Sequence, residues 1–295
     1  MKILHIVENY YPKKSGMSEV VKQISKPIHK NGHKITIATG YDRLREEDFH
    51  SPIDIEEFKI TGNYAIGITG DKNEIDRYIN YVLNGDFDII TFFAAQHWGT
   101  DLILPFLDRL KTKKIFVPTG FSGLYIPLYR EYFNKMGEWI KNFDCNIFLS
   151  NDYKDINFVR DLNITSDKIV IIPNGASKYE FLGESKQDIR KKLSIPKEAS
   201  LILSVGSHTA LKGHSEIIKI LKKTKIKNIH FVIVANKIEK FKLDFSFKNL
   251  IRLILHKFFN KNIGRGCELV CARSMTKFNR SIFRIFDRKR LLITT

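Results

Sequence analysis

LILSVGSHTALKGHSEIIKIL, residues 201–221, joins a strand, a glycine loop and a helix in direct succession. The apolar run at 201–205 predicts a buried strand that ends at Gly206, and a polar loop then runs to Lys212 and Gly213. After the loop, apolar residues recur at helical spacing. Such a layout points backbone N–H groups and a helix N-terminus at an anion, and Lys212 adds a positive charge.

The stretch therefore predicts a site for a phosphate or a diphosphate. Its glycine spacing fits neither a Walker A loop nor a GxGxxG fingerprint. The alternative interpretation, an ordinary strand-to-helix turn with a solvated lysine, stays open on this stretch alone.

Length and composition indicate a folded protein with room for two domains. The chain has 295 residues, of which 43% are hydrophobic and 12% aromatic, and these values argue against disorder. No uninterrupted apolar run approaches the roughly 20 residues of a membrane span. The N-terminal MKILHIV lacks the long apolar region and cleavage site of a signal peptide. We therefore expect a cytoplasmic protein.

The three cysteines, Cys145, Cys267 and Cys271, are too few for a disulfide framework. Cys267 and Cys271 stand four residues apart with no second pair, so no zinc site is expected. Free thiols in a reducing compartment are the simpler interpretation.

The formal charge of +17 is concentrated in the C-terminal part of the chain. Residues 1–185 carry 23 Lys and Arg against 25 Asp and Glu, whereas residues 186–295 carry 26 against 7. This asymmetry indicates an anionic partner for the C-terminal part, such as a phosphorylated ligand, an anionic membrane face or nucleic acid. A lysine-rich proteome would also raise the basic count, so charge alone does not select among them.

Strand-like and helix-like segments alternate along the first half of the chain. The predicted strands are 3–7, 34–39, 53–60, 64–69, 88–93, 114–117, 145–149 and 168–172, and the predicted helices are 16–30, 71–83, 100–110, 129–143 and 151–162. Repeated strand–helix units predict a parallel sheet with helices on both faces. Ligands bind such sheets beyond the carboxyl ends of the strands, where the loops 10–16, 94–99 and 119–123 fall.

A second α/β unit follows the turn at Pro173, Asn174 and Gly175, where we place the boundary between domains 1–172 and 173–295. Its predicted elements are a short helix from the cap Ser185 to Leu193, strands at 201–205, 230–235, 268–272 and 291–294, and helices at 213–223, 247–260 and 274–286. The basic, amphipathic stretch 245–263 suits either a membrane surface or an ordinary crossover helix with a solvated face.

Four segments in this order resemble GT-B-fold glycosyltransferases of the family 4 type, which build polysaccharides and glycolipids. They are MKILHIVENYYPKKSGMSEVV at the N-terminus, NGHKITIAT, IIPNGASKYEF and LSVGSHTALKGHSEII. The resemblance implies an α/β protein of two Rossmann-like domains. It also implies a retaining transferase whose donor is a nucleotide sugar and whose acceptor is a glycan or a lipid-linked glycan.

The resemblance assigns the donor diphosphate to the loop that holds Gly206, Ser207, Lys212 and Gly213. Lys212 matches the diphosphate lysine of the family, while Ser207 stands where an arginine is frequent. Gly16 matches the first of two family glycines near the N-terminus, and Met17 replaces the second. No metal and no cofactor are implied, because the nucleotide sugar is a substrate.

The resemblance also suggests a catalytic residue in the first domain. His97 lies in a loop after a strand, where the family keeps a catalytic-site histidine, although it follows Asp88 at a longer spacing than usual. A structurally bonded histidine is the alternative interpretation. Thr119 and Gly120 match a His-Gly element of relatives, with the histidine absent. Lys212 is assigned to stabilising charge on the leaving nucleotide diphosphate.

The family pattern extends beyond the last strand of this sequence. Its second domain continues into two glutamates about eight residues apart that hold the nucleotide ribose and face the sugar, and no such pair is present here. On this basis we expect a C-terminally truncated transferase with an incomplete second domain. A basic protein of this kind is expected in the cytoplasm, with peripheral attachment to the anionic inner membrane face.

Three rival interpretations remain at this point. The chain could be a catalytically inactive remnant that binds a membrane or a partner protein. It could be a nucleotide-sugar epimerase, because a fold does not fix a reaction. Nucleic-acid binding has no recognisable motif in its support.

Overall fold

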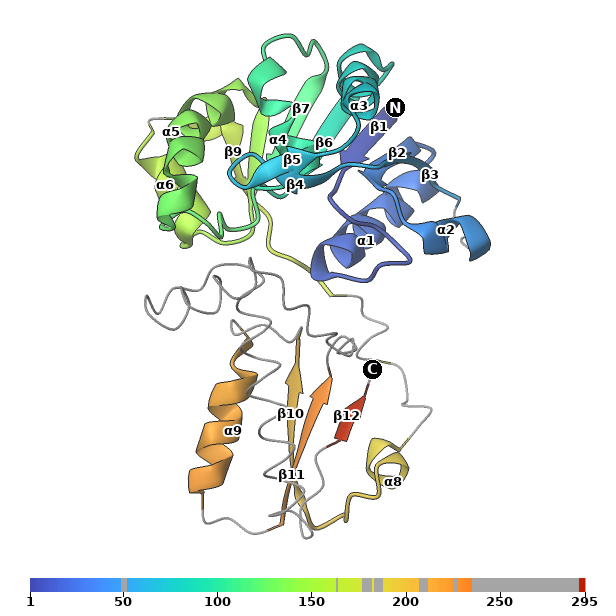
Figure 1. The fold of residues 1–295 in the computed structure, drawn as a ribbon, viewed down its shortest axis with the longest axis vertical. Coiled ribbons are helices and arrows are strands. Elements are labelled where there is room, and N and C mark those ends of the chain that lie inside the picture. The colour runs from blue at the N-terminus through green and yellow to red at the C-terminus, as the bar shows by residue number, and fades with distance from the viewer. Residues whose placement is uncertain are drawn as a thin grey trace. The chain divides into compact units, whose positions relative to one another are not determined.

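A computed structural model describes residues 1–48, 52–162, 164–176, 182, 188–206, 212–224, 228–234 and 292–294. The chain divides into two compact units, Met1–Lys178 and Tyr179–Thr295 (Figure 1). We describe each unit by itself. Within the described residues, no helix combines the length and apolarity that crossing a bilayer requires.

The first unit is built on a parallel sheet of seven strands in the order β3-β2-β1-β6-β7-β8-β9. The strands are β1 (Lys2–Ile6), β2 (Lys34–Gly40), β3 (Asp54–Phe58), β6 (Ile89–Phe93), β7 (Lys113–Val117), β8 (Cys145–Phe148) and β9 (Ile169–Ile171). Ile3 of β1 pairs with Ile35 of β2 on one side and with Ile89 of β6 on the other. The predicted parallel α/β sheet is confirmed.

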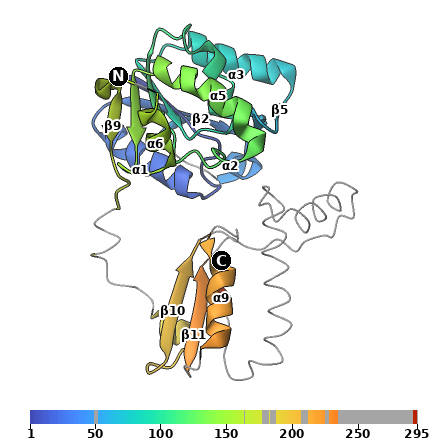
Figure 2. The same cartoon turned by 90° about the vertical axis from the view of Figure 1, so that its left-hand side faces the viewer.

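Both faces of this sheet are covered, as the alternation of side chains along β1 shows. Leu4 and Ile6 pack in one apolar cluster with Tyr78 of α3, whereas Ile3 packs in another with Val21 of α1. Figure 2 shows α3 and α5 on one side of the sheet and α1 on the other. The helices are α1 (Gly16–Lys30), α2 (Arg43–Asp48), α3 (Lys72–Asn84), α4 (Trp98–Asp101), α5 (Arg130–Trp139) and α6 (Lys154–Arg160), with 3-10 turns at Leu104–Phe106, Pro127–Tyr129, Ile140–Asn142 and Ser166–Lys168.

The helix predicted at 100–110 is wrong. α4 ends at Asp101, and a 3-10 turn, Leu104–Phe106, follows. Pro105 explains the break, because it has no N–H to donate to the carbonyl of Asp101. The strand predicted at 64–69 is instead a small antiparallel hairpin of β4 (Thr61–Asn63) and β5 (Gly67–Thr69).

The second unit holds a parallel sheet in the order β10-β11-β12 among its described residues. Its elements are α8 (Ile189–Lys192), β10 (Ser200–Val205), α9 (His214–Lys223), β11 (Ile229–Val234) and β12 (Leu292–Thr294). The strand and the helix predicted within 201–221 are therefore confirmed as β10 and α9, and residues 207–211 of the loop between them lie outside the described residues. The cap of α8 is Asp188, which accepts from the backbone N of Lys191 at 3.2 Å.

Several predictions lie outside the described residues. These are Ser185, the strand at 268–272, the helices at 247–260 and 274–286, the stretch 245–263, Cys267 and Cys271.

Candidate functional site

The loop between β10 and α9 brings Lys212 back onto Gly206. A Cβ at Gly206 would lie 3.0 Å from Cγ and 3.1 Å from Cδ of Lys212, so the lysine stem rests where a larger residue would stand. Gly206 has a φ of +154° and Gly213 a φ of +67°, which L side chains rarely adopt. Glycine at both positions therefore allows the backbone conformation in which the Lys212 stem packs on Gly206.

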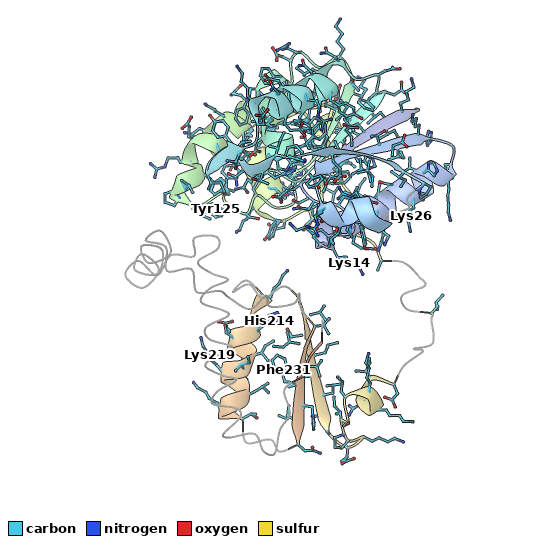
Figure 3. The ribbon with its side chains drawn as sticks, turned by 45° about the vertical axis from the view of Figure 1, so that its right-hand side comes forward. Lys14, Lys26, Tyr125, His214, Lys219 and Phe231 are labelled. Carbon is cyan, nitrogen blue, oxygen red and sulfur yellow. The ribbon has the colours of Figure 1, made fainter. Side chains whose placement is uncertain are left out.

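His214 fixes the base of this loop. Its side chain is 1% exposed. Its Nδ1 lies 2.9 Å from Oγ of Ser204 in β10, and its Nε2 lies 3.2 Å from the carbonyl oxygen of Gly206. Figure 3 shows His214 at the first turn of α9 and Phe231 between this helix and the strands. His214 was not predicted as an anchor, although its position directly after Gly213 was a usable signal.

The N-terminus of α9 has the features of an anion site. Gly213 is its N-cap and offers no side-chain cap, so the first backbone N–H groups receive no side-chain acceptor from that residue. Lys212 is exposed, and no described carboxylate pairs with its ammonium. Ser207 lies outside the described residues, and its assigned role stays a prediction.

In the first unit, the topology marks the edge of the sheet where a ligand would bind. The strand order reverses between β1 and β6, and ligands of open parallel sheets bind beyond the carboxyl ends of strands at such a switch point. The loop from Val7 to Ser15 leaves β1 there, and the loop from Ala94 to His97 leaves β6. The loops predicted at 10–16 and 94–99 therefore lie on either side of the expected ligand site.

Arg45 holds the loop after β1. Its guanidinium donates from Nε to the carbonyl of Tyr11 at 2.7 Å and from Nη2 to the carbonyl of Tyr10 at 3.2 Å. The buried guanidinium also forms an ion pair with Glu57 of β3, whose side chain is partly exposed. A serine capping box then starts α1 at Gly16, where a Cβ would meet no atom within 4 Å. The space beside Gly16 is thus open, and donor contact there stays a prediction.

His97 is a bonded loop residue in this structure. It is 3% exposed, and its Nδ1 accepts from the backbone N of Gly99 at 3.2 Å. Its Nε2 therefore carries the proton, which it donates to the carbonyl of Phe93 at 2.8 Å. Burial lowers the pKa of His97 to about 4. Both nitrogens are engaged, an arrangement that fits the structural interpretation, while a catalytic role stays a prediction.

The loops after β6 and β7 share strained backbone. Ala94, Gln96, Thr119 and Phe121 all have positive φ, from 43° to 70°, a conformation that costs energy and clusters at functional sites. The Gln96 side chain accepts from the backbone N of Gly123 at 3.0 Å, which ties the two loops together. A side chain thereby links neighbouring loops at the carboxyl edge of the sheet.

A buried carboxyl that sequence analysis missed supports this pair of loops. Asp101 is 2% exposed and accepts from the Tyr132 hydroxyl at 2.8 Å and from the backbone N of Tyr64 at 2.9 Å. The Tyr132 hydroxyl in turn accepts from the backbone N of Gln96 at 3.1 Å. Burial raises the pKa of Asp101 to about 6. The network joins the β4–β5 hairpin, α5 and the loop after β6. Its partners lie far apart in the sequence, which gave no signal for them.

Among the described residues, no group of three His, Cys, Asp or Glu side chains could hold a metal ion. The candidate site of the second unit is instead marked by Lys212 and Gly206, and its role as an anion site stays a prediction.

No protein-family model and no curated protein matches the sequence. Solved structures do. Anabaena Alr3699/HepE, crystallised with UDP and glucose, has a TM-score of 0.60 at 13% identity, over 100% of this chain and 70% of its own. WaaG, a glycosyltransferase involved in lipopolysaccharide biosynthesis, has a TM-score of 0.53 at 11% identity, over 99% and 70%.

The UDP-GlcNAc 2-epimerase from Methanocaldococcus jannaschii has a TM-score of 0.52 at 13% identity, over 100% of this chain and 74% of its own. These proteins span different reactions and share an architecture. The chain therefore has the GT-B fold that these proteins share, an α/β fold with two Rossmann-like units.

Proposed function

We propose that this chain is a glycosyltransferase that moves a sugar from a nucleotide-sugar donor to a glycan or lipid-linked acceptor, with retention of configuration. The fold supports a nucleotide-sugar enzyme. The single observation that carries the proposal is the placement of Lys212, whose stem packs on Gly206 directly before the N-cap of α9 and whose ammonium pairs with no described carboxylate.

In this proposal the donor diphosphate binds Lys212 and the first backbone N–H groups of α9. As the glycosidic bond to the donor breaks, negative charge grows on the departing diphosphate. The Lys212 ammonium and the helix N-terminus stabilise that charge more than they stabilise the ground state, which lowers the barrier. His214 acts as a positioning residue, because it ties the start of the helix to Ser204 and Gly206.

We assign the acceptor to the first unit, at the loops that follow β1 and β7. The proposed location is the cytoplasm, with peripheral attachment to the anionic inner membrane face. The positive charge of residues 186–295 supports this attachment, since each basic residue near such a surface contributes about 1 kcal/mol.

The test compares Lys212→Ala with Lys219→Ala. Lys219 lies on the same helix but is exposed and pairs with Glu216, so it is a matched control. With UDP-glucose as donor probe, turnover should fall about 100- to 1,000-fold in Lys212→Ala and stay within about twofold in the control. Equal turnover in both variants would show that Lys212 does not bind the diphosphate.

An epimerase is a second candidate, because one of the similar structures is a UDP-GlcNAc 2-epimerase. Incubation with UDP-GlcNAc and no acceptor separates the two functions. A 2-epimerised nucleotide sugar in that mixture would favour the epimerase, whereas a product that forms only with an acceptor would favour the transferase.

The inactive alternative makes a third outcome. A chain that binds no nucleotide sugar but sediments with anionic vesicles would be a membrane-binding remnant.

A further inference from the structure

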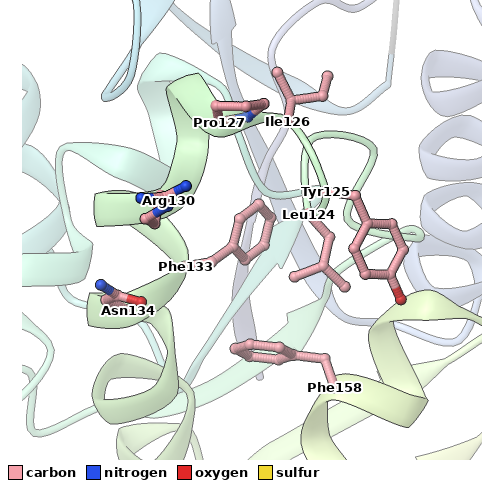
Figure 4. Close-up of a pocket in the computed structure, with 8 residues that line it drawn as sticks. All are labelled: Leu124, Tyr125, Ile126, Pro127, Arg130, Phe133, Asn134 and Phe158. Atoms are coloured by element: carbon pink, nitrogen blue, oxygen red, sulfur yellow. The ribbon is translucent and has the colours of Figure 1, made fainter.

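A pocket of about 360 Å³ lies in the first unit, beside the loop that follows β7. The rings of Phe133 from α5 and Phe158 from α6 line it together with Leu124, so much of its surface is apolar (Figure 4). Its volume is at the small end of the roughly 300–1,000 Å³ that ligand pockets occupy.

Arg130 supplies a charge at this pocket that the fold itself does not use. It is the first residue of α5 and exposed, and no described group forms an ion pair or hydrogen bond with its guanidinium. The 3-10 turn Pro127–Tyr129 runs directly into α5, and the backbone N–H of Arg130 donates to the carbonyl of Pro127, which leaves the guanidinium as the unused group of this residue. Its charge at the pocket is therefore available to a bound anion.

The surroundings of the pocket favour an amphipathic anion. Tyr125, which lines the pocket, is 76% exposed, and Nζ of Lys154 lies 5.7 Å from the centroid of its ring. Nearby carboxylates have partners of their own: Glu131 pairs with Lys135, and Asp155 accepts from the backbone N of Gly120. Positive charge and exposed apolar surface therefore meet at one opening.

We propose that this pocket binds a single aliphatic chain together with the phosphate that it carries, in a prenyl-phosphate-linked acceptor. The chain packs on Phe133 and Phe158, and the phosphate pairs with Arg130. The pocket is too small for the two acyl chains of a membrane phospholipid. Its lining residues 124–127 directly follow the loop 119–123, so the occupant's headgroup lies near the carboxyl end of β7, where ligands of such sheets bind. The inference rests on the proposed transferase function and names its acceptor class.

The test is a calorimetric titration of the full chain with farnesyl phosphate. The parent should bind it, and Arg130→Gln should weaken binding at least tenfold, because a charge-assisted hydrogen bond is lost. Arg109→Gln is the matched control, since Arg109 is exposed and does not line the pocket. Farnesol, which lacks the phosphate, should bind the parent as weakly as farnesyl phosphate binds Arg130→Gln. Equal binding to all three proteins, or none to the parent, would overturn the inference.

Two further titrations separate this inference from the proposed function. If UDP binds the parent and farnesyl phosphate does not, the acceptor class is wrong and the transferase proposal stands. If farnesyl phosphate binds through Arg130 and UDP does not bind, the transferase proposal fails while the lipid-phosphate site stands. Arg130-dependent sedimentation with phosphatidylglycerol vesicles, without binding of farnesyl phosphate, would assign the surface to the membrane and overturn the inference.

Discussion

Replacing His97 by asparagine should remove much of the acid sensitivity of the first unit. Asparagine is a good helix N-cap, so its side-chain oxygen can keep the bond that Nδ1 of His97 accepts from Gly99. It cannot keep the bond from Nε2 to the carbonyl of Phe93. The substitution therefore deletes the titrating group while the start of α4 is retained.

The expected magnitude follows from burial. The pKa of His97 falls from 6.5 to about 4, and so does that of His5, because both rings are buried. A lowered pKa means that the folded state resists protonation, so stability is present above pH 6.5 and is lost as the pH falls toward 4. Each histidine contributes about 3 kcal/mol, since one pKa unit is worth about 1.4 kcal/mol.

Asp101 acts in the opposite direction. Its pKa rises from 3.8 to about 6, so the folded state binds its proton more tightly, and its stabilising effect is lost as the pH rises through that range. Protonation of Asp101 in acid therefore stabilises the folded state by about 3 kcal/mol, which offsets the stability lost through one of the two histidines. These three groups together should cost the parent roughly 3–4 kcal/mol between pH 7 and pH 4, and the two that remain in His97→Asn should cost less than about 1 kcal/mol over the same range.

Urea unfolding at several pH values, followed by tryptophan fluorescence, measures these slopes. Trp98 is 1% exposed and adjacent to the substitution, so it reports on the right region. His33→Asn, at a partly exposed position, controls for the loss of an imidazole. A slope in His97→Asn equal to that of the parent would refute the reasoning.

Two further substitutions test the two candidate loops. Gly206→Ala should weaken UDP binding about as much as Lys212→Ala does, because the new Cβ would displace the lysine stem. Gly175→Ala is the control and should leave UDP binding unchanged, because its Cβ would meet nothing within 4 Å. Equal UDP affinity in both glycine variants would argue against the packing of Lys212 on Gly206. Arg45→Met should cost about 2–4 kcal/mol in urea unfolding, since it removes a buried guanidinium that bonds the carbonyls of Tyr10 and Tyr11 and pairs with the half-buried Glu57. Lys34→Met breaks an exposed pair and should cost at most about 1 kcal/mol, so similar losses in both variants would contradict the buried role of Arg45.

Most of the architecture could be predicted because it depends on local signals. Apolar runs such as Ile89–Phe93 form central strands, and the helix predicted at 16–30 is α1 residue for residue. The prediction at 100–110 failed because apolar spacing outweighed Pro105, whose missing N–H ends the helix pattern. The proline was visible in the sequence, and the helix prediction gave it too little weight.

The candidate site was predictable only where it follows one stretch of chain. Gly206, Lys212 and Gly213 lie within eight residues of one another, so their shared loop could be inferred before the structure. The bonds from Tyr132 to Asp101 and from Arg45 to Tyr11 join residues more than 30 positions apart, and no periodicity or spacing in the sequence predicts such contacts. His97 shows the same limit, since its bonds to the backbone could not be derived from its place after a strand.

The most direct test of the central claim compares UDP with uridine as ligands of the full chain by calorimetry. If Lys212 and the start of α9 hold a diphosphate, UDP should bind at least tenfold more tightly than uridine, and Lys212→Ala should remove that difference while Lys219→Ala preserves it. Equal affinities for UDP and uridine in the parent, or a preference for UDP that survives Lys212→Ala, would contradict the account.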